Sequence, residues 1–122
     1  MLKLLLDEEI SPAVAAGLRR RNGALIISAM TEWEGGNFVG KDASDILREA
    51  ADQELTLVTY DRLTIPTILK AWSEEECLHG GVIFVDEKAI SPAETGELVT
   101  ALARVQDEAG SWEWTNRVTF LR

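Results

Sequence analysis

Short apolar runs that each end in an aspartate alternate with helix-like segments along this chain. Asp7 follows the run 1–6, Asp61 follows the run 55–60, and Asp86 follows the run 82–85. Runs of this length, bounded by polar residues, are typical of strands buried on both faces. Helices between such strands act as crossovers, which make neighbouring strands parallel. The pattern predicts a three-layer α/β/α fold with a mostly parallel sheet of four to five strands and helices on both faces.

Helix-start signals lie between the apolar runs. Ser11-Pro12 combines a capping residue with a proline at the first helical position, and Asn22-Gly23 ends that helix. Asp42 can cap a second helix and Pro66 opens a third. The sequence Ser91-Pro92-Ala93-Glu94 is a capping box and predicts the start of the last helix.

Two further strands and one long loop complete the predicted organisation. The apolar residues 24–27 predict a second strand, and the tail 112–121 ends in the alternation typical of a half-covered edge strand. Residues 30–40, between the second strand and the helix that Asp42 can cap, are predicted to form a loop with several glycines. A loop of that length in so small a domain is more often functional or mobile than incidental.

Composition limits the class of protein. A chain of 122 residues predicts one domain, spanning 1–122. The formal charge of −9 argues against binding nucleic acid by broad electrostatic attraction. The single cysteine, Cys77, cannot form an internal disulfide, and no apolar stretch approaches the roughly 18 residues of a membrane span. A cytoplasmic protein is therefore expected.

The acidic residues after the strands point to a metal site. Asp7, Asp61 and Asp86 share the carboxyl edge if their strands are parallel, and Asp42 and Asp45 at a helix start can join them. Gathered carboxylates repel one another unless a cation compensates, and hard oxygen ligands suit Mg²⁺ or Mn²⁺. The predicted metal ligands are Asp7, Asp42, Asp45, Asp61 and Asp86.

Ordinary turn chemistry offers another interpretation of the same residues. Aspartate favours turns and helix caps, so Asp42 can be a cap and Asp45 its partner in the first turn. Asp86 can belong to a simple turn with Lys88. Glu8 is close enough to Asp7 to be a secondary ligand. Both interpretations stay open at this point.

Three segments of the sequence resemble the small PIN-like domain family related to VapC toxins. They are Leu-Leu-Leu-Asp-Glu-Glu-Ile-Ser-Pro over 4–12, Asp-Ile-Leu-Arg-Glu-Ala-Ala over 45–51 and Leu-Val-Thr-Tyr-Asp-Arg over 57–62. The resemblance is strong through Arg62 and continues more loosely through 81–85. It implies a PIN-like fold and a Mg²⁺- or Mn²⁺-dependent ribonuclease. Members are often the toxin of a toxin–antitoxin pair, which implies RNA as substrate and an antitoxin as partner.

The resemblance assigns roles to the same acids. It implies hydrolysis of RNA phosphodiesters by a metal-activated water, with Asp7, Asp45 and Asp61 as the candidate catalytic residues. The basic residues Arg62 and Lys41 each adjoin a candidate acid, so both are candidates for contacts with substrate phosphate.

The chain departs from the family pattern at two positions. Leu63 stands where the family has a second aspartate, and Ala43 stands where its central acid is expected. A catalytically degenerate module that acts by binding a protein is therefore the alternative function. A phosphate-receiver module is disfavoured because Lys88 lies past Asp86, where no receiver lysine fits.

Four tryptophans support the alternative of a binding module. Tryptophan is enriched at the energetic centres of protein interfaces. Trp33, in the loop, and the pair Trp112 and Trp114, in the tail, are expected to be exposed, whereas Trp72 lies on an apolar helical stripe and is expected in the core. The partner would be an antitoxin or a second copy of the chain.

Overall fold

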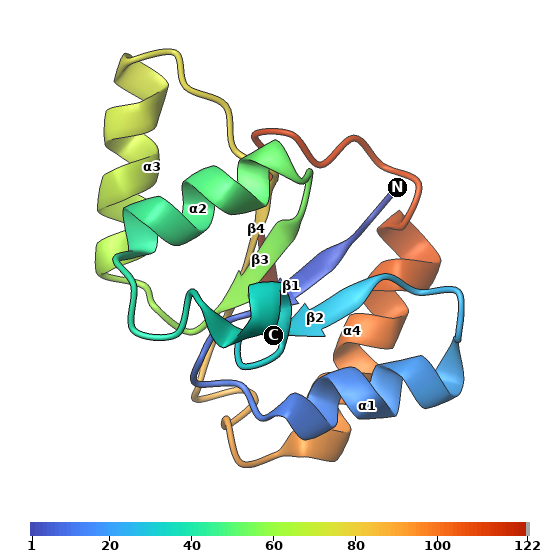
Figure 1. The fold of residues 1–122 in the computed structure, drawn as a ribbon. Coiled ribbons are helices and arrows are strands. Elements are labelled where there is room, and N and C mark those ends of the chain that lie inside the picture. Colours follow the sequence, from blue (N-terminus) through green and yellow to red (C-terminus); the bar gives the residue numbers. More distant parts are fainter. Residues whose placement is uncertain (122) are drawn as a thin grey trace.

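Five parallel strands form a single sheet in the order β2-β1-β3-β4-β5 (Figure 1). The structure is a computed structural model that describes residues 1–121. The predicted α/β class with a parallel sheet is confirmed. The strands are β1 (Leu4–Leu6), β2 (Ile27–Ala29), β3 (Thr56–Thr59), β4 (Val82–Val85) and β5 (Val118–Leu121).

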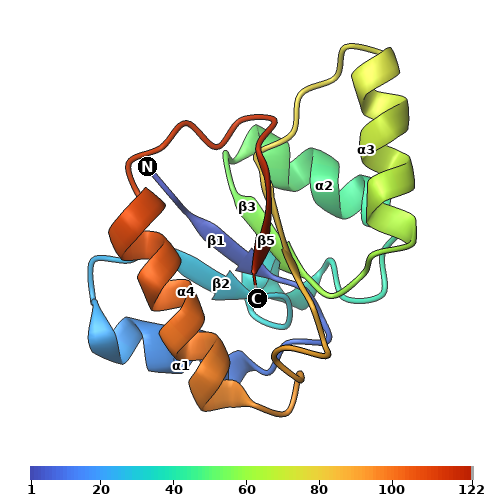
Figure 2. The same ribbon diagram turned by 180° about the vertical axis from the view of Figure 1, so that it is seen from behind.

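Helices cover both faces of the sheet, as predicted. One face carries α1 and α4, which pack against each other, and the other carries α2 and α3 (Figures 1 and 2). Within residues 1–121, no helix has the length and apolar character needed to cross a membrane. The helices are α1 (Pro12–Arg21), α2 (Ala43–Asp52), α3 (Thr64–Glu74), α4 (Thr95–Ala109) and the short 3-10 helix η1 (Trp33–Gly36).

The central strands are buried on both sides, which explains their unbroken apolar sequences. Leu4 and Leu6 belong to the core beneath α1 and α4, whereas Leu5 between them belongs to the core beneath α2 and α3. All three side chains are fully buried. Successive side chains of a strand point to opposite faces, so a sheet covered by helices on both faces requires apolar residues at every position.

The connection from β4 to β5 through α4 has the opposite hand to the other three connections. The chain steps in the same direction from β3 to β4 and from β4 to β5, so right-handed crossovers would place α3 and α4 on one face. Instead α4 packs against α1 on the other face (Figure 2). The β4-α4-β5 unit is therefore left-handed, and α4 leaves the α2 and α3 face of β5 without a helix.

The predicted helix starts are confirmed for α1 and shifted for α3 and α4. Helix α3 begins at Thr64, two residues before Pro66. The Ser11 hydroxyl accepts a hydrogen bond from the Ala13 amide at 3.1 Å, and α1 begins at Pro12. In the capping box, the Glu94 carboxylate accepts a hydrogen bond from the Ser91 amide at 3.0 Å. Because the backbone of Glu94 is not helical (ψ 66°), α4 begins at Thr95 rather than at the proline.

The second strand lies later than predicted. The sequence predicts it over 24–27, but β2 spans Ile27–Ala29. Asn22 causes the shift, because its side-chain oxygen accepts from the Ala24 amide at 3.0 Å and its carbonyl accepts from the Leu25 amide at 3.1 Å. These bonds fold Asn22 to Leu25 into a turn, so the first half of the apolar run is not part of the strand.

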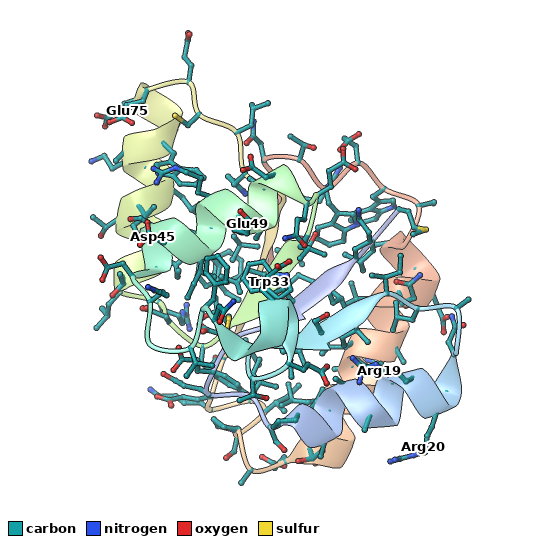
Figure 3. The ribbon with its side chains drawn as sticks, in the orientation of Figure 1. Arg19, Arg20, Trp33, Asp45, Glu49 and Glu75 are labelled. Atoms are coloured by element: carbon teal, nitrogen blue, oxygen red, sulfur yellow. The ribbon has the colours of Figure 1, made fainter. Side chains whose placement is uncertain are left out.

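Two tryptophans predicted to be exposed are in fact buried. Trp33 is 5% exposed and Trp114 is 4% exposed, and each donates its indole N–H to an oxygen inside the protein. Trp33, the first residue of η1, belongs to the core on the α2 and α3 side (Figure 3). The expectations for the other two are confirmed: Trp72 is buried and Trp112 is 45% exposed.

His79 holds the turn before β4 in its neutral form. The buried ring accepts a hydrogen bond at Nδ1 from the Gly81 amide at 3.0 Å. Burial lowers the pKa of His79 below its ordinary value of 6.5. The unfolded chain therefore binds this proton more readily than the folded chain, and acidification through 6.5 favours unfolding.

We expect the free energy of unfolding to fall between pH 7.5 and pH 5.5 partly through His79. The His79→Asn variant retains an acceptor near the Nδ1 position but does not titrate, so its stability should fall less over the same interval. Urea unfolding at the two pH values measures the difference. Equal losses in the parent and the variant would exclude His79 as the titrating group.

Candidate functional site

The carboxyl ends of β1 and β3 flank the point where the strand order reverses. From β1 the chain steps to β2 on one side, and it later returns to place β3 on the other side of β1. Open α/β sheets bind ligands in the crevice outside such a switch point. Asp7 directly follows β1, and Asp61 lies two residues beyond the end of β3. The two aspartates predicted to share an edge are therefore on neighbouring strands at the switch point.

A cavity of about 360 Å³ lies at this position. Its wall brings together residues from the ends of β1 and β3, from the segment before α2 and from the start of α3. Lys41 lines it and is the basic residue closest in sequence to Asp42. The cavity contains three of the five predicted metal ligands. The acidic residues that line it are Asp7, Glu8, Glu9, Asp42 and Asp61.

The buried hydroxyl of Thr59 connects the two aspartates. Thr59 donates from Oγ1 to Oδ2 of Asp7 at 2.6 Å, and the amide of Asp61 donates to the same hydroxyl at 3.0 Å. The other oxygen of Asp7 accepts from the Glu8 amide at 2.8 Å. Asp7 is thus oriented from both sides. Thr59 was not among the predicted site residues, although a threonine inside an apolar strand, two residues before Asp61, is a detectable signal.

We expect Thr59→Val to cost about 1–3 kcal/mol of unfolding free energy, because it leaves a part-buried carboxylate oxygen and a part-buried amide without their partner. Valine has nearly the same shape, so the loss reports the hydrogen bonds rather than a cavity. Urea unfolding measures it. Thr119→Val on β5 is the matched control, and an equal cost in both variants would contradict the role given to Thr59.

One carboxylate oxygen of Asp61 holds the turn before α3, and the other is available. Its Oδ1 accepts from the amides of Leu63 at 3.1 Å and Thr64 at 2.8 Å, at the start of α3. The turn interpretation of this aspartate is therefore confirmed, whereas the N-cap position of α3 is Leu63. Within residues 1–121 no hydrogen bond reaches Oδ2, so this oxygen is available to a ligand in the cavity.

The segment before α2 is held against β1 by Glu8. The Glu8 carboxylate accepts a hydrogen bond from the Gly40 amide at 2.6 Å. Asp42 occupies the N-cap position of α2, but its side chain makes no capping hydrogen bond. Asp42 lines the cavity. The predicted cap position is confirmed, whereas the predicted cap interaction is not formed.

Three of the predicted site residues lie outside the cavity. Asp45 is exposed on α2 and pairs with Arg48 at 3.9 Å (Figure 3). Asp86 follows β4, which neighbours β3 and not β1, and its Oδ1 accepts from the Lys88 amide at 2.9 Å. The guanidinium of Arg62 lies 5.8 Å from the centre of the Phe120 ring.

Tyr60 separates β3 from Asp61 but does not serve the cavity. It belongs to the core on the α1 and α4 side, where its hydroxyl donates to the Ile90 carbonyl at 2.8 Å. Burial, followed by the nearby carboxylates, raises the pKa of Tyr60 to about 12. The phenol therefore stays protonated at neutral pH and is structural.

The donor set fits a partly hydrated Mg²⁺ or Mn²⁺ ion. Within residues 1–121, no three His, Cys, Asp or Glu side chains are close enough to hold a metal ion among them. Mg²⁺ does not require such a cage, because it keeps several waters and is usually bound through one or two carboxylates and substrate phosphates. The available oxygen of Asp61 and the carboxylate of Asp42, which makes no capping hydrogen bond, are two such carboxylate ligands.

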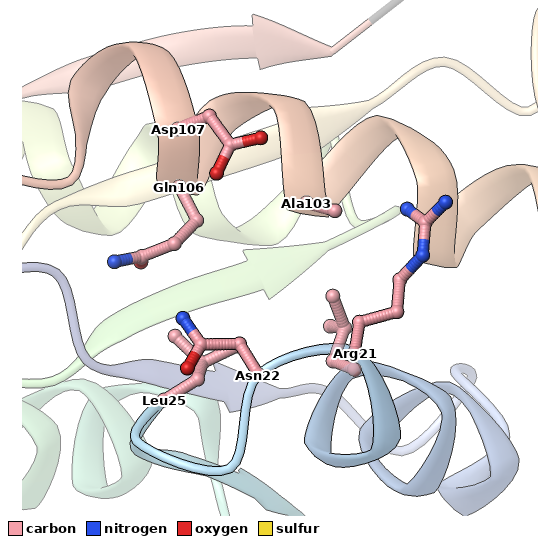
Figure 4. A pocket seen from close by; sticks show the side chains of 7 residues that line it. Arg21, Asn22, Leu25, Ala103, Gln106 and Asp107 are labelled. Carbon is pink, nitrogen blue, oxygen red and sulfur yellow. The ribbon is translucent and has the colours of Figure 1, made fainter.

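A second cavity, of about 230 Å³, lies between the end of α1 and the second half of α4 (Figure 4). Gln106 and Asn22 face each other across it. The side-chain oxygen of Gln106 is buried without a hydrogen-bond partner. The wall also contains Arg21 and Asp107 but none of the switch-point acids, so this cavity is separate from the candidate site.

Comparison of the chain with protein families, curated proteins and solved structures found no match. The candidate site therefore rests on its own geometry and chemistry.

Proposed function

We propose that this protein is a Mg²⁺- or Mn²⁺-dependent phosphodiesterase that cleaves RNA. The observation that carries the proposal is the acid-lined cavity at the switch point, where a buried threonine orients Asp7 toward Asp61. Acids held together at a ligand-binding position are suited to a divalent cation and its anionic ligand. The choice of RNA rests on the resemblance of 4–12, 45–51 and 57–62 to PIN-like domains.

Each residue of the cavity has a distinct part in the proposed reaction. Asp61 and Asp42 would hold the partly hydrated metal ion, and Asp7 would bind it through one of its waters. The ion would supply Lewis-acid activation of water and of the phosphate. Lys41 would pair with a phosphate oxygen. Thr59 keeps Asp7 in place by donating to one of its oxygens, so that carboxylate does not have to reorganise when a ligand binds.

The resemblance also supports a cellular setting for the proposed ribonuclease. It suggests a cytoplasmic toxin whose partner is an antitoxin protein, or a homodimer of such chains. A single exposed cysteine agrees with a reducing compartment.

A degenerate module that binds protein is the second candidate function. Leu63 favours it, because this side chain is 85% exposed where the resemblance expects an acid. Such a module would retain the fold without cleaving RNA.

The test is metal binding and cleavage measured on the same preparation. Mn²⁺ should raise the melting temperature of the chain, and mixed RNAs should be cleaved with Mn²⁺ or Mg²⁺ but not with EDTA. The Asp61→Asn variant should lose both effects. Metal binding without cleavage would support the degenerate module, and the absence of both would refute the metal site.

A further inference from the structure

The two edge strands of the sheet differ in whether side chains hydrogen bond to their outward peptide groups. At the β2 edge, Arg19 donates to the Ile27 carbonyl at 2.6 Å, and the Ala29 amide donates to the Glu32 carboxylate at 2.9 Å. The hydrogen bond from Arg19 lowers the pKa of Glu32, so the pair stays charged. Peptide groups of β2 with which another strand could pair are therefore already hydrogen bonded to side chains.

The β5 edge has no such protection within residues 1–121. The Val82 amide donates to the Arg117 carbonyl at 2.9 Å, so this residue turns its peptide oxygen toward β4. Alternate residues of a strand direct their peptide groups to opposite sides, so those of Val118 and Phe120 point away from β4. No other described strand pairs with β5.

The side chains of the same two residues are also uncovered. Val118 is 42% exposed and Phe120 is 51% exposed. The left-handed β4-α4-β5 connection explains this, because a right-handed one would have laid α4 across them (Figure 2). Exposed apolar residues on an unprotected edge strand are a surface on which another strand can add.

Arginines accompany the exposed aromatic rings at both ends of β5. Arg62 lies over Phe120, and Arg117 lies 4.7 Å from the centre of the Trp112 ring. This positive charge stands out in a chain of net charge −9. The strip formed by Arg62, Trp112, Arg117, Val118 and Phe120 is called the β5 strip below.

A groove adjoins the β5 strip on the α4 side. It has a volume of about 360 Å³, and its wall is mostly apolar. Arg104 and Glu108 contribute one charge of each sign to it. Side chains of an added strand that point to this side would find an apolar surface, as alternate residues of a paired strand do.

We propose that β5 binds an extended, acidic segment of another protein, which adds to the sheet as a sixth strand. Its backbone would pair with the free peptide groups of Val118 and Phe120. Its apolar side chains would contact Phe120 and the groove, and its carboxylates would pair with Arg62 and Arg117. This inference does not depend on the proposed nuclease activity.

Charge selects this occupant over a second copy of the chain. In a two-fold symmetric pair of β5 strands, the end with Arg62 would meet the end with Arg117, so like charges would be opposed. An acidic strand has the complementary sign. A nucleic acid strand would be attracted to the arginines and would stack on the aromatic rings, but it would not form strand pairing with the free peptide groups of β5.

The test uses a synthetic peptide of Glu-Glu-Val-Val repeats, which presents both residue types on both faces of an added strand. NMR detects the backbone amides of the intact chain. The peptide should shift the amide signals of Val118 and Phe120. A version with N-methylated Val should bind at least about tenfold more weakly, because it cannot complete the strand pairing. Val118→Pro should weaken the unmodified peptide to a similar extent, since this amide points away from β4.

Charge variants and competitors complete the test. Arg62→Ala and Arg117→Ala should each weaken binding, whereas Arg20→Ala on the exposed surface of α1 should not. The matching peptide of Lys-Lys-Val-Val repeats should not bind. The proposal would be overturned if the acidic peptide does not bind or if N-methylation does not change its binding. It would also be overturned if a single-stranded oligouridylate shifts the signals of the β5 strip when the peptide does not. Self-association of the parent chain that Val118→Pro abolishes would also overturn it.

Discussion

Gly81→Ala should lower the free energy of unfolding by about 3 kcal/mol or more. Gly81 leads into β4 with a φ of +101°, where side chains are strained. A Cβ atom there would stand 2.6 Å from the Trp114 carbonyl oxygen and 3.1 Å from Oγ1 of Thr56. The backbone cannot move away freely, because the Gly81 carbonyl accepts a hydrogen bond from the Leu57 amide at 3.0 Å.

Urea unfolding followed by tryptophan fluorescence measures the loss. Gly23→Ala is the matched control, since nothing lies within 4 Å of a Cβ at that position. It should change stability by only a few tenths of a kcal/mol. A Gly81→Ala variant as stable as the control would show that the approach of the tail to β4 is looser than the structure indicates.

Asp7→Asn should reduce metal-dependent RNA cleavage at least about a hundredfold while the fold is kept. Asparagine has nearly the same shape and retains an oxygen that can accept from Thr59, so of the two hydrogen bonds to this side chain only the one from the Glu8 amide is lost. It removes the negative charge, however, and with it the attraction for a divalent cation. Mn²⁺ should then no longer raise the melting temperature.

Asp86→Asn provides the matched control for this variant. Asp86 also follows a strand at the same edge, but it lies outside the cavity and accepts from the Lys88 amide. Its replacement should leave metal binding and cleavage unchanged. Equal losses in both variants would place the metal elsewhere at the edge, and unchanged cleavage in Asp7→Asn would indicate a contaminating nuclease.

Local sequence signals correctly predicted helices and strands where the interactions that form them are between residues close in sequence. The apolar run 82–85 is β4, and Ser11-Pro12 starts α1. The signals failed where a competing local bond intervened, as at Asn22, whose turn displaces the start of β2. They also failed for Trp33 and Trp114, because the partners that bury these rings are distant in sequence.

The candidate site was predicted in part for the same reason. An aspartate after a parallel strand must lie at the carboxyl edge, so the placement of Asp7 and Asp61 at one edge follows from the sequence pattern. Which acids share a cavity depends on strand order. Since β4 lies beyond β3, Asp86 is outside the cavity, while Glu9 and the buried Thr59 contribute to the site unpredicted.

The sequence by itself determined the class of fold, the edge on which its acids gather and the apolar character of the central strands, because these depend on short-range periodicity and on the geometry of parallel strands. Only the tertiary structure decided the order β2-β1-β3-β4-β5 and the face on which α4 packs. Both follow from long-range packing, which no local pattern encodes. That packing places Asp7 beside Asp61 and leaves β5 open along one edge and one face.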